Sequence, residues 1–269
     1  MFPGFSIFGF FLSSYAICAI VGIFAACPLS IYFFKRRSDD KGADISLIFV
    51  FMFAALGTFL GMHLLYGITN IAYWGELLNA EDFSELWNRF GIIFGGSVFY
   101  GGLIGGLIAG GISARVQKLP MKDVVDCGAP VIAVIHGFGR IGCFLGGCCY
   151  GVEWEHGIIF QNSLVESANG VPRLPVQLIE AGFEFALGIT LFILLAKRRL
   201  HGRLLCLYLI VYPIERFIIE FWRGDEYRGF IGVFSTSQLI SIAIFSGTLF
   251  FLIVEKGRSN KYVKTETGK

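Results

Sequence analysis

Seven apolar runs divide the chain, and each is long enough to cross a lipid bilayer. A transmembrane α-helix needs about 20 mainly apolar residues, and a helix satisfies its own backbone polar groups inside lipid. Only 16% of the residues are charged, against about a quarter in soluble domains. The sequence therefore predicts an all-α integral membrane protein with a single domain over residues 1–269. Its seven transmembrane helices are expected at about residues 11–34, 45–67, 92–113, 123–146, 176–196, 203–222 and 234–254.

Basic residues gather in alternate connections between these runs. The connections after the first, third and fifth runs and the tail at about 255–269 hold 16 of the 22 Lys and Arg residues. The other connections hold only Arg89, Arg173, Arg223 and Arg228. Cytoplasmic loops of membrane proteins carry the excess of Lys and Arg. The pattern therefore predicts an N-terminus outside the cytoplasm and a cytoplasmic C-terminus.

The start of the chain lacks the basic segment and the small-residue cleavage site of a signal peptide, so the first run is expected to remain as a helix. The two longest connections, at about 68–91 and 147–175, are expected on the outer side. In the first of these, Phe83, Leu86 and Trp87 follow helical spacing. This spacing is compatible with a short interfacial helix and with an ordinary loop.

The third run contains many glycines at small-xxx-small spacing, in the stretch GGSVFYGGLIGGLIAGG. Such spacing lets two membrane helices approach closely. Close helix packing is the simpler interpretation. The alternative is that bare backbone here borders a lipid headgroup, with Tyr100 as a polar group beside it.

Two arginines lie inside the apolar runs. At about 1.5 Å per residue, Arg140 lies roughly 25 Å and Arg216 roughly 20 Å from the cytoplasmic ends of their helices, in the outer leaflet. An arginine at membrane depth costs roughly 3 kcal/mol or more, so it normally faces a partner or a substrate. Guanidinium groups bind phosphate oxygens bidentately. The pair therefore indicates a site for a phospholipid headgroup.

Other polar side chains reach the same level of the membrane. Helical spacing places His136 and Cys143 on the face of Arg140, and Tyr212 and Glu220 on the face of Arg216. Arg216 and Glu220 could also simply neutralise each other. The remaining candidates in this layer are Tyr15, Tyr100, Gln177 and Glu180, with Glu215 on a different face of its helix. A tyrosine, histidine or carboxylate here could move a proton.

Five stretches of the chain resemble the motifs of the phosphatidylglycerol:prolipoprotein diacylglyceryl transferases of the bacterial plasma membrane. GRIGCFLGGCCYG at 139–151 resembles GRxGNFINGExxG, and YPIERFIIEFWR at 212–223 resembles a motif that ends in RxxxEFFR. FYGGLIGG at 99–106, PRLPVQLIE at 172–180 and FLGMHLLY at 59–66 resemble FHGGLIG, PRHPSQLYE and FLGGRIGY. These motifs occur in the same order over nearly the whole chain.

The resemblance implies transfer of the diacylglyceryl group of phosphatidylglycerol to the thiol of a lipobox cysteine in a secreted preprotein, with release of glycerol phosphate. It implies that Arg140 and Arg216 bind phosphate, that Glu220 orients Arg216 and that Gly151 allows close approach of lipid or peptide. Tyr15 and Tyr212 would line the cavity. No cofactor, metal or nucleic acid is expected.

The chain departs from the family pattern at four positions. The family's asparagine is Cys143, its signature glutamate is Cys148, its histidine is Tyr100, and an arginine is His63. Either His136 replaces the missing histidine as a base, or the phospholipid site persists and the acceptor has changed. A non-catalytic lipid transporter or sensor is a further alternative.

Cys143, Cys148 and Cys149 have several interpretations. They could form a tight turn of small residues. A disulfide would join Cys143 to one of the other two, because a bond between adjacent cysteines is strained. A membrane thiol redox protein would use all three. A metal site is less favoured, since the sequence has no histidine or further cysteine nearby at zinc-like spacing.

Overall fold

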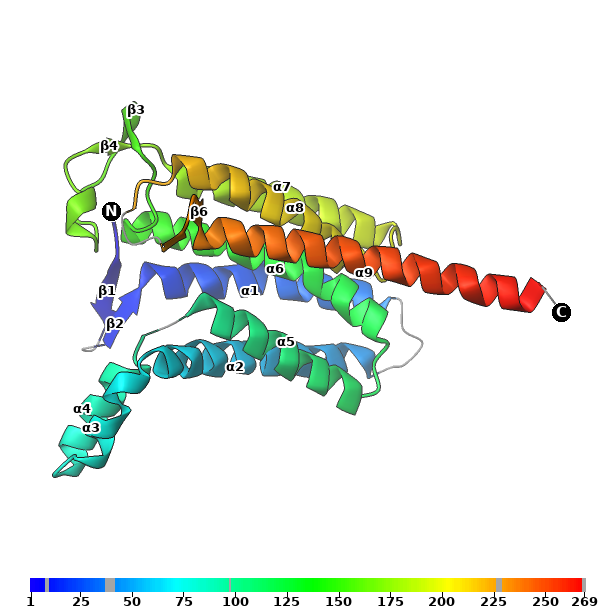
Figure 1. The fold of residues 1–269 in the computed structure, drawn as a ribbon, viewed down its shortest axis with the longest axis horizontal. Coiled ribbons are helices and arrows are strands. Elements are labelled where there is room, and N and C mark those ends of the chain that lie inside the picture. Colours follow the sequence, from blue (N-terminus) through cyan, green and yellow to red (C-terminus); the bar gives the residue numbers. More distant parts are fainter. Residues whose placement is uncertain (8–9, 37–41, 97, 226–228, 268–269) are drawn as a thin grey trace. The chain divides into compact units, whose positions relative to one another are not determined.

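The computed structural model describes residues 1–7, 10–36, 42–96, 98–225 and 229–267. They form two compact units, and each is described by itself. The first unit combines Met1–Ser30 with Val125–Lys269, and the second comprises Ile31–Val124. Nearly all regular structure in both units is helical (Figure 1).

The first unit is a helical bundle with short hairpins at one end (Figure 1). Its helices are α1 (Ser14–Lys35), α6 (Met121–Gly146), α7 (Val176–Ala196), α8 (Leu204–Ile219) and α9 (Thr236–Thr267), with the first turn of α6 and the last of α1 in the second unit. Its hairpins are β1 (Gly4–Ile7) with β2 (Phe10–Ser13), β3 (Glu153–Ile159) with β4 (Pro172–Arg173), and β5 (Phe230–Ile231) with β6 (Phe234–Ser235). Two 3₁₀ turns are η2 (Glu166–Ala168) and η3 (Glu220–Trp222).

Glycines let the helices of this bundle pack closely. A Cβ atom at Gly137 of α6 would lie 2.8 Å from the Phe185 ring of α7, and one at Gly188 of α7 would lie 2.8 Å from Val134 of α6. A Cβ atom at Gly142 would lie 2.8 Å from the backbone of Tyr15 in α1. Lipid is as apolar as the side chains, so membrane helices gain stability mainly from such close contacts. The helices face outward with large apolar residues, among them Phe24, Phe250 and Ile253.

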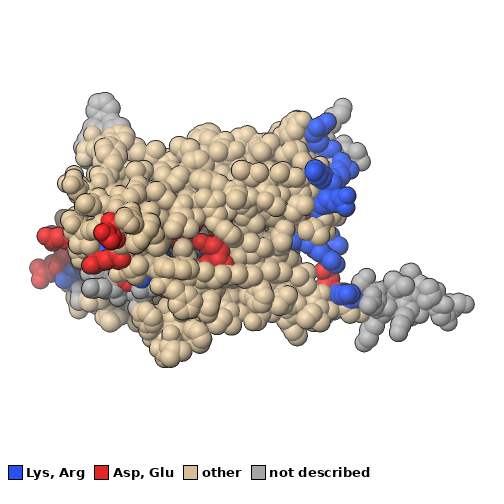
Figure 2. All heavy atoms as spheres, turned by 90° about the horizontal axis from the view of Figure 1, so that it is seen from above, with Lys and Arg blue, Asp and Glu red and all other residues tan. Residues whose placement is uncertain are grey.

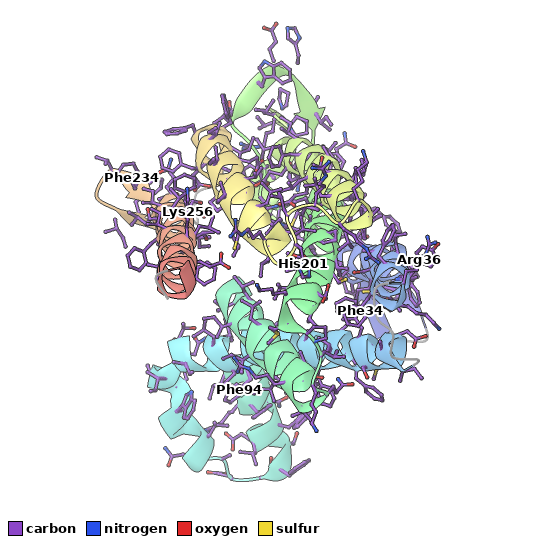
Figure 3. All side chains as sticks on the ribbon, turned by 90° about the vertical axis from the view of Figure 1, so that its right-hand side faces the viewer. Phe34, Arg36, Phe94, His201, Phe234 and Lys256 are labelled. Atoms are coloured by element: carbon purple, nitrogen blue, oxygen red, sulfur yellow. The ribbon has the colours of Figure 1, made fainter. Side chains whose placement is uncertain are left out.

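Basic residues mark one end of this bundle. Lys197, Arg198, Arg199 and Arg203 are exposed around the connection from α7 to α8, and Lys256 is exposed on α9. Figure 2 shows Lys and Arg gathered at that end. Figure 3 looks along the helices from the same end, with His201 and Lys256 labelled. The hairpins lie at the opposite end of the bundle.

The second unit is built on one helix pair. It contains α2 (Ala43–Thr69), η1 (Ile71–Tyr73), α3 (Trp74–Leu78), α4 (Phe83–Phe94) and α5 (Phe99–Val116). A Cβ atom at Gly61 of α2 would lie 2.2 Å from the carbonyl oxygen of Gly101 in α5, and one at Gly57 would lie 2.4 Å from that of Gly105. The glycine-rich run therefore serves close helix packing, as predicted.

The predicted helices are present with corrected ends. The connection expected at 68–91 is largely helical. Of the two alternatives for the segment at Phe83, the helix is present, and it extends to Phe94. The Asp82 side chain caps this helix by accepting from the Glu85 N–H at 2.6 Å, a start signal that the sequence analysis did not use. Gly95 and Gly96 then separate α4 from α5 inside the run expected as one helix at 92–113.

Five described helices are long and apolar enough to cross a membrane, namely α1, α2, α6, α7 and the first part of α9. The apolar helix at 101–116 is shorter. Helix α8 has 16 residues and passes directly into η3. The chain is therefore a mainly helical membrane protein, and the count of seven spans stays a prediction.

Candidate functional site

Two arginines of the first unit converge on one carboxylate. Arg140 Nη2 of α6 lies 3.1 Å from Glu180 Oε1 of α7, and Arg216 Nη1 of α8 lies 3.7 Å from the same oxygen. Glu180 is buried, and the Arg140 side chain is only 12% exposed. The contacts are at ion-pair distance but lack hydrogen-bond geometry. The two guanidinium groups thus share one buried anion.

Arg216 has two further partners. Its Nη2 atom lies 2.7 Å from Glu220 Oε2 and donates to Ser237 Oγ of α9 at 3.1 Å. The i, i+4 spacing of Arg216 and Glu220 predicted their pairing, because such residues share one face of a helix. Four helices, α6 to α9, therefore position this charged cluster.

A second polar cluster lies one helical turn from the first. His136 Nδ1 is 2.9 Å from Glu184 Oε1 and 3.3 Å from the Tyr208 hydroxyl. The Tyr212 ring stacks on Tyr208 and meets the His136 ring edge to face. Since a neutral imidazole that donates from Nδ1 has its lone pair on Nε2, contact with Glu184 would set His136 up as a proton acceptor.

The segment after α6 is fixed by close backbone contacts. Gln177 is buried and donates from Nε2 to the Cys148 carbonyl oxygen at 2.7 Å. The Gly151 N–H donates to the Leu174 carbonyl oxygen, and a Cβ atom at Gly151 would lie 2.4 Å from that oxygen. Gly151 also bridges to Arg223. The close approach predicted at Gly151 is thus made, in this structure, by neighbouring backbone.

Three thiols meet at the end of α6. The Sγ atoms of Cys143, Cys148 and Cys149 all lie within 4.8 Å of one another, and each side chain is half-buried. They are free thiols, so the disulfide that was one of the alternatives for Cys143 is not formed in this structure. Hydrogen bonds from the other two thiols, followed by the charges of Arg223 and Arg140, lower the pKa of the Cys149 thiol.

Arg223 is a buried arginine that the sequence analysis assigned only to a loop. Its Nε and Nη2 atoms donate to the two carboxylate oxygens of Asp225 at 2.7 and 2.6 Å. Burial opposes its charge, but these hydrogen bonds raise the pKa of Arg223 above its ordinary value. Arg223 therefore adds a permanent positive charge near Cys149.

Two predicted site residues belong to the second unit. His63 Nδ1 lies 2.8 Å from the carbonyl oxygens of Phe94 and Gly96, so its described contacts hold the end of α4. The side chain of Tyr100 lies outside the part of the chain that the structure describes. The remaining candidate, Tyr15 of α1, lies in the first unit close enough to Arg140 and Cys143 for electrostatic interaction.

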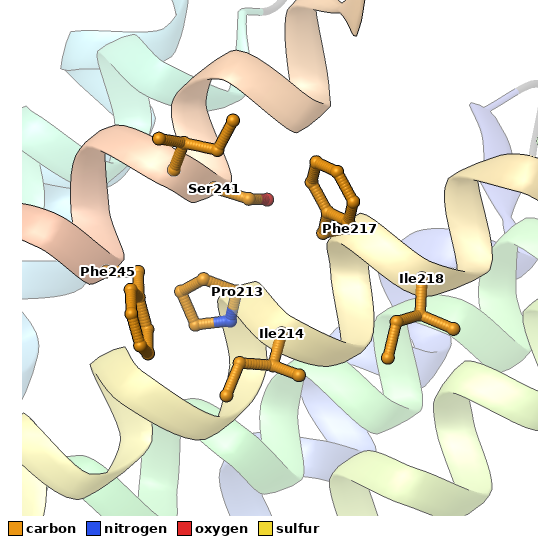
Figure 4. A pocket seen from close by; sticks show the side chains of 7 residues that line it. Pro213, Ile214, Phe217, Ile218, Ser241 and Phe245 are labelled. Carbon is orange, nitrogen blue, oxygen red and sulfur yellow. The ribbon is translucent and has the colours of Figure 1, made fainter.

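An apolar groove lies between α8 and α9. It has a volume of about 260 Å³ and is lined on α8 by Pro213, Ile214, Phe217 and Ile218, and on α9 by Ser241, Ile242 and Phe245 (Figure 4). Arg216 and its partner Ser237 lie within about one turn of this lining on the same two helices. Apart from the Ser241 hydroxyl, the side chains that line the groove are apolar.

Glu184, Tyr208 and Ser237 were not predicted from the sequence as site residues. Glu184 lies one turn beyond Glu180, and Tyr208 one turn before Tyr212, so helical spacing from residues already chosen could have found both. Ser237 had no such signal. Neither carboxylate oxygen of Glu215 has a hydrogen-bond partner among the described residues, but Glu215 lies close enough to Arg140 and Arg216 for electrostatic interaction.

Comparisons with known proteins identify the family of this chain. The family model described as prolipoprotein diacylglyceryl transferase matches residues 4–254. Over 265 residues the chain is 36% identical to phosphatidylglycerol–prolipoprotein diacylglyceryl transferase 2 of Clostridium perfringens, covering 97% of this chain and 96% of the relative. Similar enzymes of Clostridium tetani and Geobacter sulfurreducens are each 34% identical, covering 94% and 86% of this chain and 97% and 86% of their own. The chain therefore belongs to the prolipoprotein diacylglyceryl transferase family.

Proposed function

We propose that this protein transfers the diacylglyceryl group of phosphatidylglycerol to the thiol of a lipobox cysteine in a prolipoprotein. The convergence of Arg140 and Arg216 on one oxygen of Glu180 carries the proposal. Two fixed positive charges that already share an anion are suited to bind the phosphate of the lipid and the phosphate that leaves. The apolar groove between α8 and α9 supports it, because it offers a place for an acyl chain on the two helices that carry Arg216 and Ser237.

In the proposed reaction the acceptor thiol gives its proton to a base, and its sulfur forms a bond to the terminal glyceryl carbon of the diacylglycerol moiety. The bond from that carbon to the phosphate oxygen breaks. Glycerol phosphate leaves with the electron pair, and Arg140 and Arg216 stabilise the charge that develops on it. Glu220 and Ser237 orient Arg216.

His136 is the proposed base. Its contact with Glu184 is the observation that supports this role, because a carboxylate on one imidazole nitrogen makes the other nitrogen the proton acceptor. Tyr15, Tyr212, Gln177 and Gly151 are proposed to shape the substrate cavity, and Glu180 to hold the arginines before lipid binds. His63, Tyr100 and Cys143 stay candidates from the sequence.

The whole chain is proposed to form one membrane domain with seven spans in the bacterial plasma membrane, with the N-terminus outside and the tail in the cytoplasm. The basic residues around the α7–α8 connection and on α9 support this orientation. In it, the charged cluster faces the outer leaflet, where a secreted preprotein presents its lipobox.

The test uses purified protein in detergent micelles with phosphatidylglycerol and a lipobox peptide, and mass spectrometry detects the thioether product. We expect transfer by the parent chain and a loss of about 100-fold or more in Arg140→Ala and Arg216→Ala, since removing one preorganised donor costs about that much. Arg203→Ala, an exposed arginine at the far end of α8, is the matched control. Full transfer by Arg140→Ala would overturn the assignment.

The base is tested in the same assay. His136→Ala should lower the rate of transfer by about 100-fold or more, the usual contribution of a general base, while binding of phosphatidylglycerol persists. Binding without any product in the parent chain would instead favour a lipid transporter or sensor.

A further inference from the structure

The three thiols at the end of α6 form a cluster that takes part in no chemical step of the proposed reaction. From their arrangement we propose that Cys143, Cys148 and Cys149 bind a soft, thiophilic metal cation, for which Cu(I) is the best match. The proposal does not depend on the transferase activity. It rests on the local fold of residues 143–149, on the distances between the sulfur atoms and on the charges beside them.

The backbone brings the three thiols together. Helix α6 ends in a turn in which the Cys148 N–H donates to the Cys143 carbonyl oxygen and the Gly147 N–H to that of Phe144, both at 3.1 Å. Gly147 has a φ of +75°, which completes this helix-ending motif. The chain is therefore folded back so that Cys148 and Cys149 lie over the last turn of α6.

Cys149 is held in an unfavourable backbone conformation. Its φ is +59°, a left-handed conformation that residues with a side chain seldom adopt, because Cβ then lies too close to the following carbonyl oxygen. Strain of this kind persists where the surrounding structure imposes it, and it is frequent at functional sites. Here it turns the third thiol toward the other two. Gln177 of α7 supports the turn by donating to the Cys148 carbonyl oxygen.

The distances suit a cation with three sulfur ligands. A cation about 2.3 Å from each sulfur in a trigonal arrangement requires sulfur atoms about 4 Å apart. The three Sγ atoms lie within 4.8 Å of one another, so side-chain rotations alone can close the site. All three side chains are half-buried, so a cation can reach them from solvent and then be largely shielded from it.

Ligand type and charge select the metal class. Thiolates are soft ligands that favour Cu(I), and three of them complete its coordination, whereas zinc sites usually have four ligands. Three thiolates with a monovalent cation carry two negative charges. Arg140 and Arg223 are close enough to Cys149 to interact with it electrostatically, so they offset this charge. The spacing of the three cysteines in the sequence did not indicate this site, because the turn at the end of α6 is what brings their sulfur atoms together.

A disulfide explains the cluster less well. It would join only two of the three sulfurs and leave the third without a role. A bond between the adjacent Cys148 and Cys149 would be strained, and a bond from Cys143 would leave the strained Cys149 or the anchored Cys148 unexplained. Binding of one cation uses all three thiols and the turn that presents them.

The test titrates the full chain in detergent micelles, kept reduced by a phosphine, with Cu(I) against a colorimetric chelator. We expect one Cu(I) per chain, and a loss of at least about tenfold in affinity for each of Cys143→Ser, Cys148→Ser and Cys149→Ser. Cys206→Ser and Cys27→Ser, which change half-buried cysteines of α8 and α1, should bind as the parent does. Unchanged binding by the triple variant would overturn the proposal.

A second measurement does not rely on variants that fold. X-ray absorption at the copper edge of the loaded parent chain should show three sulfur ligands at one distance. Nitrogen or oxygen ligands in the first shell, or no copper retained after gel filtration, would overturn the proposal. Without metal, each serine variant should have the melting temperature of the parent chain. Lost binding then reflects the lost sulfur ligand and not a loss of folding.

Discussion

At the scale of single residues, Glu180 occupies the place where a phosphate is expected. Its carboxylate lies between Arg140 and Arg216 and has no hydrogen-bond geometry to either. A phosphate has more oxygens and more charge, so it can make the bidentate contacts that Glu180 does not make. We therefore regard Glu180 as the anion that keeps both arginines in place until the lipid arrives.

The variant Glu180→Gln tests this role. It removes the negative charge that lies beside the buried Arg140 and Arg216. Breaking a buried ion pair typically costs about 3–5 kcal/mol, so the melting temperature in neutral detergent should fall. Added phosphatidylglycerol should then raise the melting temperature of the variant more than that of the parent chain, because binding to the folded state stabilises it.

The experiment has two controls, the lipid diacylglycerol and the variant Glu155→Gln. Diacylglycerol has no phosphate and should not restore stability. Glu155→Gln changes an exposed carboxylate of β3 and should behave as the parent does. Equal stabilisation of parent and Glu180→Gln by phosphatidylglycerol would show that phosphate does not take the place of this carboxylate.

The sequence predicted contacts within one helix better than contacts between helices. Helical spacing placed Glu220 beside Arg216, and their atoms lie 2.7 Å apart. Spacing could not show that Glu184 of α7 faces His136 of α6, because the rotation of one helix against another depends on packing at residues such as Gly137 and Gly188. The thiol cluster was hidden for a related reason, since it depends on left-handed residues in a turn.

At the scale of elements, α4 owes its start to a set of local hydrogen bonds. Glu85 accepts from the Glu81 N–H at 2.8 Å, while the Asp82 side chain accepts from the Glu85 N–H. Arg89, one turn later, also donates to Glu85. The first two contacts give partners to backbone N–H groups that would otherwise have none at the start of a helix.

The pKa of Glu85 makes α4 sensitive to acid. The hydrogen bond from the Glu81 N–H, followed by that from Arg89, lowers this pKa. A lowered pKa stabilises the folded helix above the unfolded value of about 4.3, and this contribution disappears as the pH falls through the folded value. Hydrogen exchange of 83–94 should therefore be slower at neutral pH, after correction for intrinsic rates, than at about pH 3.

Glu85→Gln is the matched variant for this prediction. It keeps the length of the side chain but cannot titrate, so protection of α4 should no longer change across this pH range. An equal loss of protection in parent and variant would assign the acid sensitivity to other groups.

The pair of α2 and α5 depends on glycine at the crossing. A Cβ atom at Gly61 would meet the Gly101 carbonyl oxygen at 2.2 Å, a backbone contact that no side-chain rotation relieves. Gly61→Ala should therefore destabilise the protein by about 1–3 kcal/mol, the usual cost of overpacking. Unfolding in mixed detergent micelles measures this. Gly111→Ala is the control, since its Cβ meets only a Met121 methyl group at 4.0 Å. Equal stability of Gly61→Ala and Gly111→Ala would contradict the close packing of α2 against α5 at Gly61.

The sequence located the helices by hydrophobicity and misplaced some ends for identifiable reasons. The first run was expected from about residue 11, but β2 extends to Ser13 and pairs with β1 before α1 begins. Apolar residues of short strands cannot be distinguished from those of a helix by hydropathy alone. The hairpins near Glu153 and Phe230 lie in connections, where the hydropathy pattern gives no signal.

At the scale of the whole molecule, charge should fix the orientation in the membrane. The α7–α8 connection is rich in exposed basic residues, whereas the β3–β4 hairpin at the opposite end of the bundle contains Glu153 and Glu155. The positive-inside rule places the first end in the cytoplasm and the second outside. The charged cluster would then lie in the outer half of the membrane, as the proposed acceptor requires.

Single cysteines introduced at the two ends test this orientation. Glu155→Cys and Arg199→Cys both change exposed residues, and the parent chain gives the background from its own seven cysteines. A membrane-impermeant maleimide added to intact spheroplasts should label Glu155→Cys above background, and should label Arg199→Cys only after lysis. The reverse pattern would place Arg140 and Arg216 in the inner leaflet, where no secreted lipobox can reach them, and would contradict both the orientation and the proposed acceptor.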